Sequence, residues 1–288
     1  MFEDISNWEH IGFGGMSTLE KEELLSPNEQ KFIIKYKRDF EKGTSWEDIT
    51  EYVAAIIGNL FGLRMMNVQM VTRNSRRGCL LRHFVQQNHA IMAEEGGALL
   101  QNLNEYERLQ KSEQSGEDLL INGFSFIEEF RYWDIIKEDF IDMLVFDALI
   151  GNQDRHPFNW SMLFYDNNHV EFSPIYDNGA SLGFRFDDES LLLLLQDQNK
   201  KDKYVRKAKV KAGLFEKKQV NASTVINFLK RTYPLEFTKS INKLNQFNEE
   251  LFQKKVDEIE YLSIVQKDWL KEIIPYRKMK ILSWVNEE

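Results

Sequence analysis

The sequence predicts an α+β protein made of two lobes, a small β-rich lobe near residues 1–85 and a larger, mostly helical lobe near residues 86–288. Two observations predict this division. Short runs of β-branched and aromatic residues gather before residue 85, whereas helical patterns dominate after residue 188. Between these regions an apolar helix runs directly into a polar segment at residues 149–160, where the most informative stretch of the chain begins.

The first lobe begins with a strand and a helix. Residues 31–37 form a β-branched and aromatic run that is typical of a strand. Apolar side chains then recur at three- and four-residue steps over residues 46–61, which predicts a helix. Thr44 and Ser45 offer capping-box starts for this helix, and Gly62 suits its C-terminal cap.

A hairpin is predicted to end the first lobe, with strands at residues 68–72 and 78–85. In the second lobe, glycines at Gly96-Gly97 and Gly116 interrupt helical pieces, and Asn122-Gly123 predicts a turn. Further on, the patterns predict a helix at 138–150, paired strands at 162–165 and 169–172, and helices at 225–230, 247–261 and 268–285.

Composition limits the class of protein. The chain has 288 residues with a net charge of −9, so binding of nucleic acid through the whole surface is not expected. No apolar run is long enough to span a membrane, and the first residues lack a signal-peptide pattern, which predicts a cytoplasmic protein. Cys79 is the only cysteine, which excludes an intrachain disulfide. A basic run at residues 201–218 is predicted to be a solvated helix face.

Three polar side chains in the central stretch indicate phosphoryl transfer. Asp154 and Asn159 are five positions apart, and Asp177 follows after the predicted strand pair. Mg²⁺ prefers oxygen ligands, so Asn159 and Asp177 are candidate metal ligands. Asp154 would orient and deprotonate an acceptor hydroxyl, as the aspartate of the protein-kinase catalytic loop does at the same spacing. A polar turn is the alternative, but the residues inside and around the motif favour the functional interpretation.

The first lobe supplies candidate groups for nucleotide phosphates. Lys35 ends a Phe-Ile-Ile-Lys run, and Glu51 lies in the next helix, where a kinase places the ion-pair partner of its strand lysine. A solvated edge lysine is the alternative, and the position of Glu51 favours the ion pair. The glycine-rich residues 12–17, with Gly14 and Gly15, would let backbone N–H groups approach the phosphates closely.

These motifs resemble those of one known family. Residues 149–159, Leu-Ile-Gly-Asn-Gln-Asp-Arg-His-Pro-Phe-Asn, resemble the Ile-Gly-Asn-x-Asp-Arg-His-x-x-Asn segment of HipA-like serine/threonine kinases. Residues 173–177, Ser-Pro-Ile-Tyr-Asp, resemble the family's Ser-Pro-x-Tyr-Asp metal segment. Full-length HipA toxins carry an extra N-terminal subdomain, for which the residues before Gly12 leave no room, so the resemblance is to the short, stand-alone form.

The resemblance implies a two-lobed, protein-kinase-like fold and an ATP- and Mg²⁺-dependent serine/threonine protein kinase. It implies Asp154 as the catalytic residue and Asn159 and Asp177 as the Mg²⁺ ligands. The residues implied to contact the nucleotide are Gly14, Gly15, Ser17, Lys35, Glu51, Arg82, His83 and Phe84, the last three belonging to a hinge that would touch adenine more through backbone than through side chains. Ser17, and secondly Thr18, are the implied autophosphorylation sites, where a phosphate would exclude ATP.

The resemblance also implies partners. It implies a protein substrate, with a translation component among the choices, and a small antitoxin partner; it is compatible with a bacterial toxin and with an effector secreted without a cleavable signal peptide. No specific nucleic-acid binding by this chain and no membrane span are expected. Two alternatives stay open: a phosphoinositide-type lipid kinase, which shares the Asp-Arg-His-x-x-Asn loop, and a catalytically inactive kinase-fold binding protein.

Overall fold

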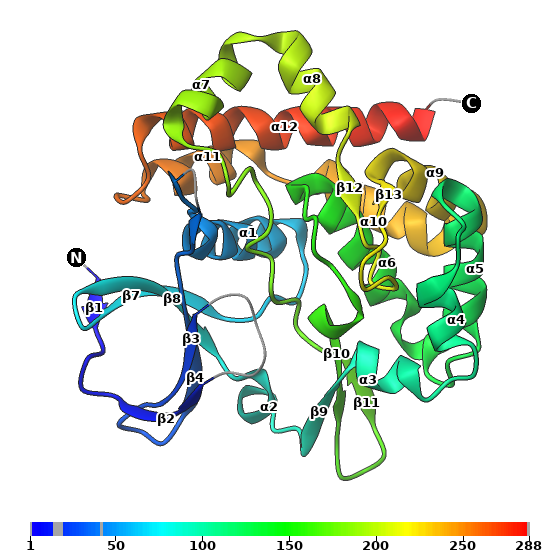
Figure 1. The fold of residues 1–288 in the computed structure, drawn as a ribbon, viewed down its shortest axis with the longest axis horizontal. Helices are drawn as coiled ribbons and strands as arrows, with labels where there is room; N and C mark the ends of the chain where they lie inside the picture. Colours follow the sequence, from blue (N-terminus) through cyan, green and yellow to red (C-terminus); the bar gives the residue numbers. More distant parts are fainter. Residues whose placement is uncertain (1, 14–19, 41–42, 287–288) are drawn as a thin grey trace.

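A computed structural model describes residues 2–13, 20–40 and 43–286 (Figure 1). A twisted sheet forms one side of the molecule, and helices form the other, which confirms the predicted α+β class. The boundary near residue 85 stays a prediction.

The sheet has six strands in the order β1-β7-β8-β4-β3-β2, in which β1 runs parallel to β7 and the other neighbours are antiparallel. Its strands are β1 (Glu3–Asp4), β2 (Glu9–Phe13), β3 (Lys21–Leu25), β4 (Lys31–Tyr36), β7 (Val68–Arg73) and β8 (Arg76–Arg82). Two short strands, β5 (Asp39–Phe40) and β6 (Gly43–Thr44), pair separately. The helix α1 (Glu47–Phe61) packs against β4, β7 and β8 and lies between the sheet and the helical part (Figure 1).

The predicted hairpin is present with a tighter turn. Asn74 and Ser75 have φ values of 50° and 61°, the pair of left-handed residues that a two-residue hairpin turn needs. The second strand ends at Arg82 and not at residue 85, because the short helix α2 (Phe84–Gln87) begins two residues after Arg82.

The predicted capping-box start of α1 is wrong. Trp46 is the N-cap residue, and no side chain caps the helix. The Ser45 hydroxyl accepts a hydrogen bond from the Arg38 N–H instead. The start of α1 is fixed by tertiary contacts, since the backbone N–H of Trp46 donates to Phe184 O and its ring N–H donates to Gly183 O. Gly62 ends the helix in the left-handed conformation, as predicted.

The helical part of the chain also holds small sheets. β10 (Ser161–Phe164) pairs with β11 (Val170–Phe172), as predicted, and with β9 (Met92–Glu95) on its other side. β12 (Lys209–Val210) pairs with β13 (Val220–Asn221). The remaining helices are α3 (Gly96–Gln101), α4 (Tyr106–Lys111), α5 (Gly116–Glu128), α6 (Trp133–Ile150), η1 (Pro157–Asn159), α7 (Asp188–Gln196), α8 (Gln198–Arg206), α9 (Ala222–Thr232), α10 (Pro234–Gln246), α11 (Glu249–Asp257) and α12 (Ile264–Asn286).

Two predictions about this region are wrong. Asn122-Gly123 is not a turn but lies inside α5, where Gly123 is required by close packing: a Cβ there would stand 2.7 Å from the Phe215 ring. Residues 201–218 are not one solvated helix face, because α8 ends at Arg206 and Lys201 is only 3% exposed.

A continuous hydrophobic core joins α1 to the C-terminal helices, and α6 runs through its centre. From Phe140 to Ile150 every residue of α6 is buried, so the segment that follows this helix starts from a rigid support. Cys79 is buried and free. None of the helices in the described ranges is both long and apolar enough to cross a membrane.

Candidate active site

The candidate catalytic loop leaves α6 through Gly151, which has a φ of 68°, a conformation that glycine adopts without strain. The buried Asn152 then fixes the start of the loop through two hydrogen bonds. Its amide donates to Asp147 Oδ1 on α6 at 3.0 Å, and its carbonyl oxygen accepts from the Asp154 N–H at 3.0 Å. Asp154 is therefore presented from a fixed backbone, with its side chain 48% exposed.

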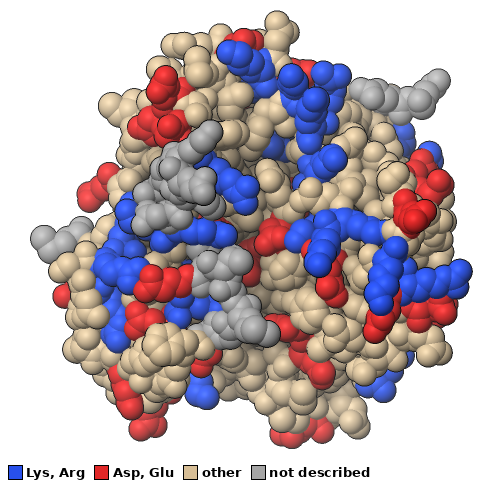
Figure 2. Space-filling view, in the orientation of Figure 1, with Lys and Arg blue, Asp and Glu red and all other residues tan. Residues whose placement is uncertain are grey.

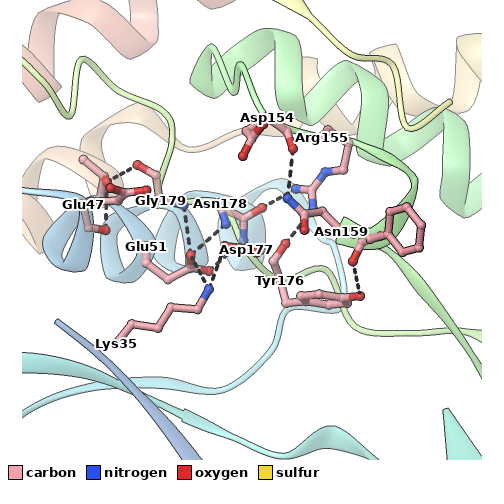
Figure 3. A network of polar contacts seen from close by, with 12 residues as sticks. Lys35, Glu47, Glu51, Asp154, Arg155, Asn159, Tyr176, Asp177, Asn178 and Gly179 are labelled. Atoms are coloured by element: carbon pink, nitrogen blue, oxygen red, sulfur yellow. Dashed lines mark hydrogen bonds and ion pairs between the residues drawn. The ribbon is translucent and has the colours of Figure 1, made fainter. Parts of the chain in front are cut away.

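Arg155 is fully buried and joins the loop to the segment that carries Asp177. Its Nε and Nη2 pair with the Asp147 carboxylate, at 3.0 and 3.1 Å. Its Nη1 donates to the backbone oxygens of Asn159 and Tyr176, and its Nη2 also donates to Asn178 Oδ1. All five donors of the guanidinium are used, so one side chain sets the distance between the two segments (Figure 3).

Asp177 stands in a strained backbone conformation, with a φ of 57°. The next two residues explain how it is held. The N–H groups of Asn178 and Gly179 donate to Glu51 Oε2 at 2.8 and 2.9 Å. Gly179 is required there because a Cβ would come within 2.8 Å of Glu47 Cγ. The helix α1 thus positions the segment that carries Asp177 through Glu51 and through this close approach.

Lys35, Glu51 and Asp177 form one ion-paired group (Figure 3). The Lys35 ammonium lies 2.7 Å from Asp177 Oδ1 and 3.7 Å from Glu51 Oε2, so the predicted contact between Lys35 and Glu51 is present. Burial by itself would lower the pKa of Lys35, but the Asp177 and Glu51 charges outweigh it and raise that pKa. Burial raises the pKa of Glu51, while the Lys35 charge opposes burial and lowers the pKa of Asp177.

The two predicted metal ligands are compatible with Mg²⁺. Asn159 lies in η1, and its amide group donates to Asp154 O at 2.9 Å, which leaves its side-chain oxygen for another partner. Asp177 has a carboxylate that is 37% exposed. One carboxylate and one amide oxygen suit an ion that takes its remaining ligands from phosphate and water. The described residues contain no cluster of three or more His, Cys, Asp or Glu of the kind that would hold a metal without such help.

The predicted hinge follows β8. The N–H groups of Arg82 and His83 are already used, by Asn67 O and Lys31 O. Phe84 begins α2, where a helix has no internal partner for its N–H, so among the three predicted hinge residues its N–H is the candidate for contact with a base. The Phe84 ring packs against Tyr176 at a centroid distance of 5.4 Å, beside Asp177. The predicted loop residues Gly14, Gly15, Ser17 and Thr18 lie outside the described residues.

Two lysines at this site were missed by the sequence argument. Lys211, which follows β12, donates to Asp154 Oδ1 at 2.6 Å although the two residues are 57 positions apart. Lys21 stands opposite Lys35 in the pairing of β3 with β4, and burial, followed by the Lys35 charge, lowers its pKa. Lys21 comes just after the glycine-rich segment, which was a usable signal. Lys211 had none, because only the fold brings it to the loop.

Fold and site together define a protein of the two-lobed, protein-kinase-like class. The HipA-like C-terminal domain family matches residues 15–235, and the chain belongs to that family. The resemblance found in the motifs is confirmed, and the chain is a HipA-like protein of the kinase type.

Individual relatives agree with this assignment. The serine/threonine-protein kinase CtkA of Helicobacter pylori is 24% identical over 289 residues, covering 94% of this chain and 82% of the relative. The crystal structure of the H. pylori proinflammatory kinase CtkA superimposes with a TM-score of 0.80 at 21% identity, covering 99% of this chain and 97% of that one. HipA in the Shewanella oneidensis MR-1 complex with HipB and operator DNA gives a TM-score of 0.57 at 13% identity, covering 99% and 67%. At these identities the two structures show the fold alone.

Proposed function

We propose that this chain is an ATP- and Mg²⁺-dependent serine/threonine protein kinase. One observation carries the proposal: the strand lysine, the α1 glutamate and the metal-segment aspartate meet in one ion-paired group, and Arg155 ties that group to the candidate catalytic loop. An arrangement of this kind can hold phosphates and present a carboxylate to an acceptor hydroxyl, which is most of what phosphoryl transfer requires.

Each polar group has a role that follows from its position. Asp154 would orient the acceptor hydroxyl and accept its proton on the carboxylate. Lys35 would bind nucleotide phosphate oxygens, and Glu51 would keep its ammonium directed toward them. Asn159 and Asp177 would hold Mg²⁺, which when bound neutralises phosphate charge.

Lys211 would keep the Asp154 carboxylate in place, since the two groups are 2.6 Å apart. It would also supply positive charge beside the acceptor, where negative charge develops during transfer. Lys211 is therefore proposed as a positioning residue.

Labelled ATP tests the proposal. The wild-type protein and Asp154→Asn would be incubated with Mg²⁺ and labelled ATP, with protein acceptors and with phosphoinositide vesicles. We expect label in protein with the wild type and about 10²- to 10⁴-fold less with the variant. Label found only in lipid would support a phosphoinositide-type kinase, and absence of both label and nucleotide binding would support an inactive binding protein.

We further propose autophosphorylation at Ser17 or Thr18. A phosphate adds nearly two negative charges and would compete with ATP phosphates for Lys35. Peptide mass spectrometry on the wild type and on Asp154→Asn distinguishes the outcomes. Phosphate on this segment only in the wild type supports self-modification, and an unmodified segment in both proteins would end this part of the proposal.

The relatives suggest two biological settings for a protein substrate, which we propose without choosing a particular one. The Shewanella HipA is described in a toxin–antitoxin complex with HipB and operator DNA, and the H. pylori relative is described as proinflammatory. A small helix-turn-helix gene beside this one would favour the toxin setting and an antitoxin partner. Recovery of the intact protein outside the cells would favour the effector setting.

A further inference from the structure

A basic pocket lies beside the candidate catalytic loop, in the region where the sequence predicted only a solvated helix face. Its volume is about 440 Å³, within the range of ligand-binding clefts. The catalytic loop, α8, β12 and α12 all contribute to it. Its basic lining residues are Lys200, Lys203, Lys207, Lys209 and Arg277.

All charged residues that line this pocket are positive. No carboxylate is found among its described lining residues, although the chain as a whole carries a net charge of −9. Asp197 lies 3.7 Å from Lys200, at the edge of the lysine group. Figure 2 shows basic side chains gathered over α8 at the top of the molecule. A concave surface of one sign concentrates ligands of the opposite sign.

Two buried donors in the lining lack partners. Arg277 is 1% exposed, and its guanidinium has no carboxylate partner among the described residues. Its Nη1 reaches only Ala148 O, at 3.4 Å, and its Nε has no hydrogen-bond partner in the described structure. The hydroxyl of Tyr204, whose ring lies 5.1 Å from the Arg277 guanidinium carbon, likewise has none there. A buried charge without a counter-ion is costly, so these donors indicate a site built for an anion.

The pocket is joined to the acceptor side of the candidate active site. Gln153, the residue before Asp154, lines it, and the Gln219 side chain donates to Gln153 O at 3.0 Å. Lys209 lines it too, two residues before the Lys211 that binds Asp154. A polypeptide that offers a hydroxyl to Asp154 would therefore have its neighbouring residues within reach of the lysines.

We propose that this pocket binds acidic side chains of the substrate polypeptide next to the acceptor hydroxyl, and so selects acidic acceptor segments. The inference rests on the proposed kinase function. Carboxylate and phosphate groups share the chemistry that the pocket recognises, because lysine and arginine donors pair with both. An acidic segment of several residues also matches the spread of charge from Arg277 to the α8 lysines.

Direct binding tests this without requiring catalysis. Labelled peptides with one serine would be compared by fluorescence anisotropy on the full chain: one flanked by glutamates, one by phosphoserines and one by glutamines. The test variant is Lys203→Glu/Lys207→Glu, and the matched control is Lys254→Glu/Lys255→Glu on α11, which makes the same charge change outside the pocket. Both pairs would also be checked by thermal melting.

We expect the acidic peptides to bind the wild type, with affinity about tenfold or more weaker in the pocket variant and changed less than about twofold in the control. The ratio between glutamate and phosphoserine peptides identifies the preferred anion. Equal binding of acidic and glutamine peptides, or equal loss in both double variants, would overturn the inference. So would tighter binding of an oligonucleotide or of anionic vesicles through the same lysines.

Phosphoryl transfer from labelled ATP to the same peptides, measured beside their binding, separates this inference from the proposed function. Acidic-peptide binding that depends on Lys203 and Lys207, without any phosphoryl transfer, would leave the pocket standing and reject the kinase proposal. Transfer that is equally fast to acidic and neutral peptides would leave the kinase standing and reject the pocket.

Discussion

Lys211 lies 57 positions after Asp154 in sequence but stands beside it in the candidate active site. Its ammonium touches the Asp154 carboxylate directly, so a substitution should alter the placement of that carboxylate. We expect Lys211→Met to lower kcat about tenfold or more while the nucleotide KM changes little, because misplacement of a reacting group is costly. Steady-state kinetics with a protein acceptor measures both constants.

Arginine offers the control for this prediction. Lys211→Arg keeps a donor that can reach a carboxylate and should recover part of the lost kcat. Lys217→Met removes an exposed lysine of the same segment and should have no effect. A purely structural role for Lys211 would show as a lower melting temperature in Lys211→Met without recovery by arginine.

At the scale of elements, α1 and the segment at residues 177–179 meet so closely that only glycine fits between them. Gly179→Ala would force a methyl group to within 2.8 Å of Glu47 Cγ and 2.9 Å of Glu47 O. We expect a loss of about 1–3 kcal/mol in the free energy of unfolding, as for other overpacked sites. Gly12→Ala is the control, since its nearest contact would be an ordinary 3.4 Å. Urea unfolding curves compare the two, and equal stabilities would show that the contact can relax.

His83, in the predicted hinge after β8, should make the stability of the protein depend on pH. Burial, followed by the Lys31 charge, lowers the pKa of His83 in the folded protein, whereas a histidine in the unfolded chain has a pKa of about 6.5. Between the lowered pKa of the folded state and that value, the unfolded chain binds more protons than the folded one, so this group makes the free energy of unfolding fall as the pH falls. Between pH ~7.5 and ~5.5, wild type should lose more stability than His83→Gln. His10→Gln, at an exposed position on β2, should behave like wild type.

The whole molecule gives a readout of nucleotide binding. A ligand that binds only the folded state adds about 2.7 kcal/mol of stability at a hundredfold excess over its Kd. We therefore expect Mg²⁺ with a non-hydrolysable ATP analogue to raise the melting temperature of wild type. Asp177→Ala should lose this Mg²⁺-dependent rise, because it removes a proposed ligand and its charge. Asp154→Asn is the control and should keep it; an undiminished rise in Asp177→Ala would place the metal elsewhere.

The sequence was most informative where the residues that contact one another lie close together along the chain. Lys35 lies in a recognisable strand and Glu51 in the next helix, where a kinase places the ion-pair partner of its strand lysine, so their contact could be predicted. The Asn74-Ser75 turn and the β10–β11 pair are similarly local. The predicted capping-box start of α1 was wrong because tertiary contacts of Trp46 with the segment after Asp177 replace a side-chain cap.

Long-range contacts explain what sequence could not supply. Lys211 and Arg277 lie 57 and 123 positions after Asp154, and neither belongs to a motif. The basic run at residues 201–218 does not reveal in sequence that Lys201 is buried and that Lys211 contacts the Asp154 carboxylate. Nor does it reveal that Lys203, Lys207 and Lys209 line a pocket. These residues have different roles because the chain after α8 places each of them in a different environment.

Arg155 limits how this sequence can change over generations. Lysine has three donors on a single atom and cannot serve Asp147, two backbone oxygens and Asn178 from one position, so no single substitution at 155 replaces it. Loss of Asp147 would leave the buried Arg155 guanidinium without its carboxylate partner, so substitutions at the two positions should occur together. Relatives that no longer need the site should lose Arg155 and Asp147 together. A search for inactive relatives could begin with these two buried positions.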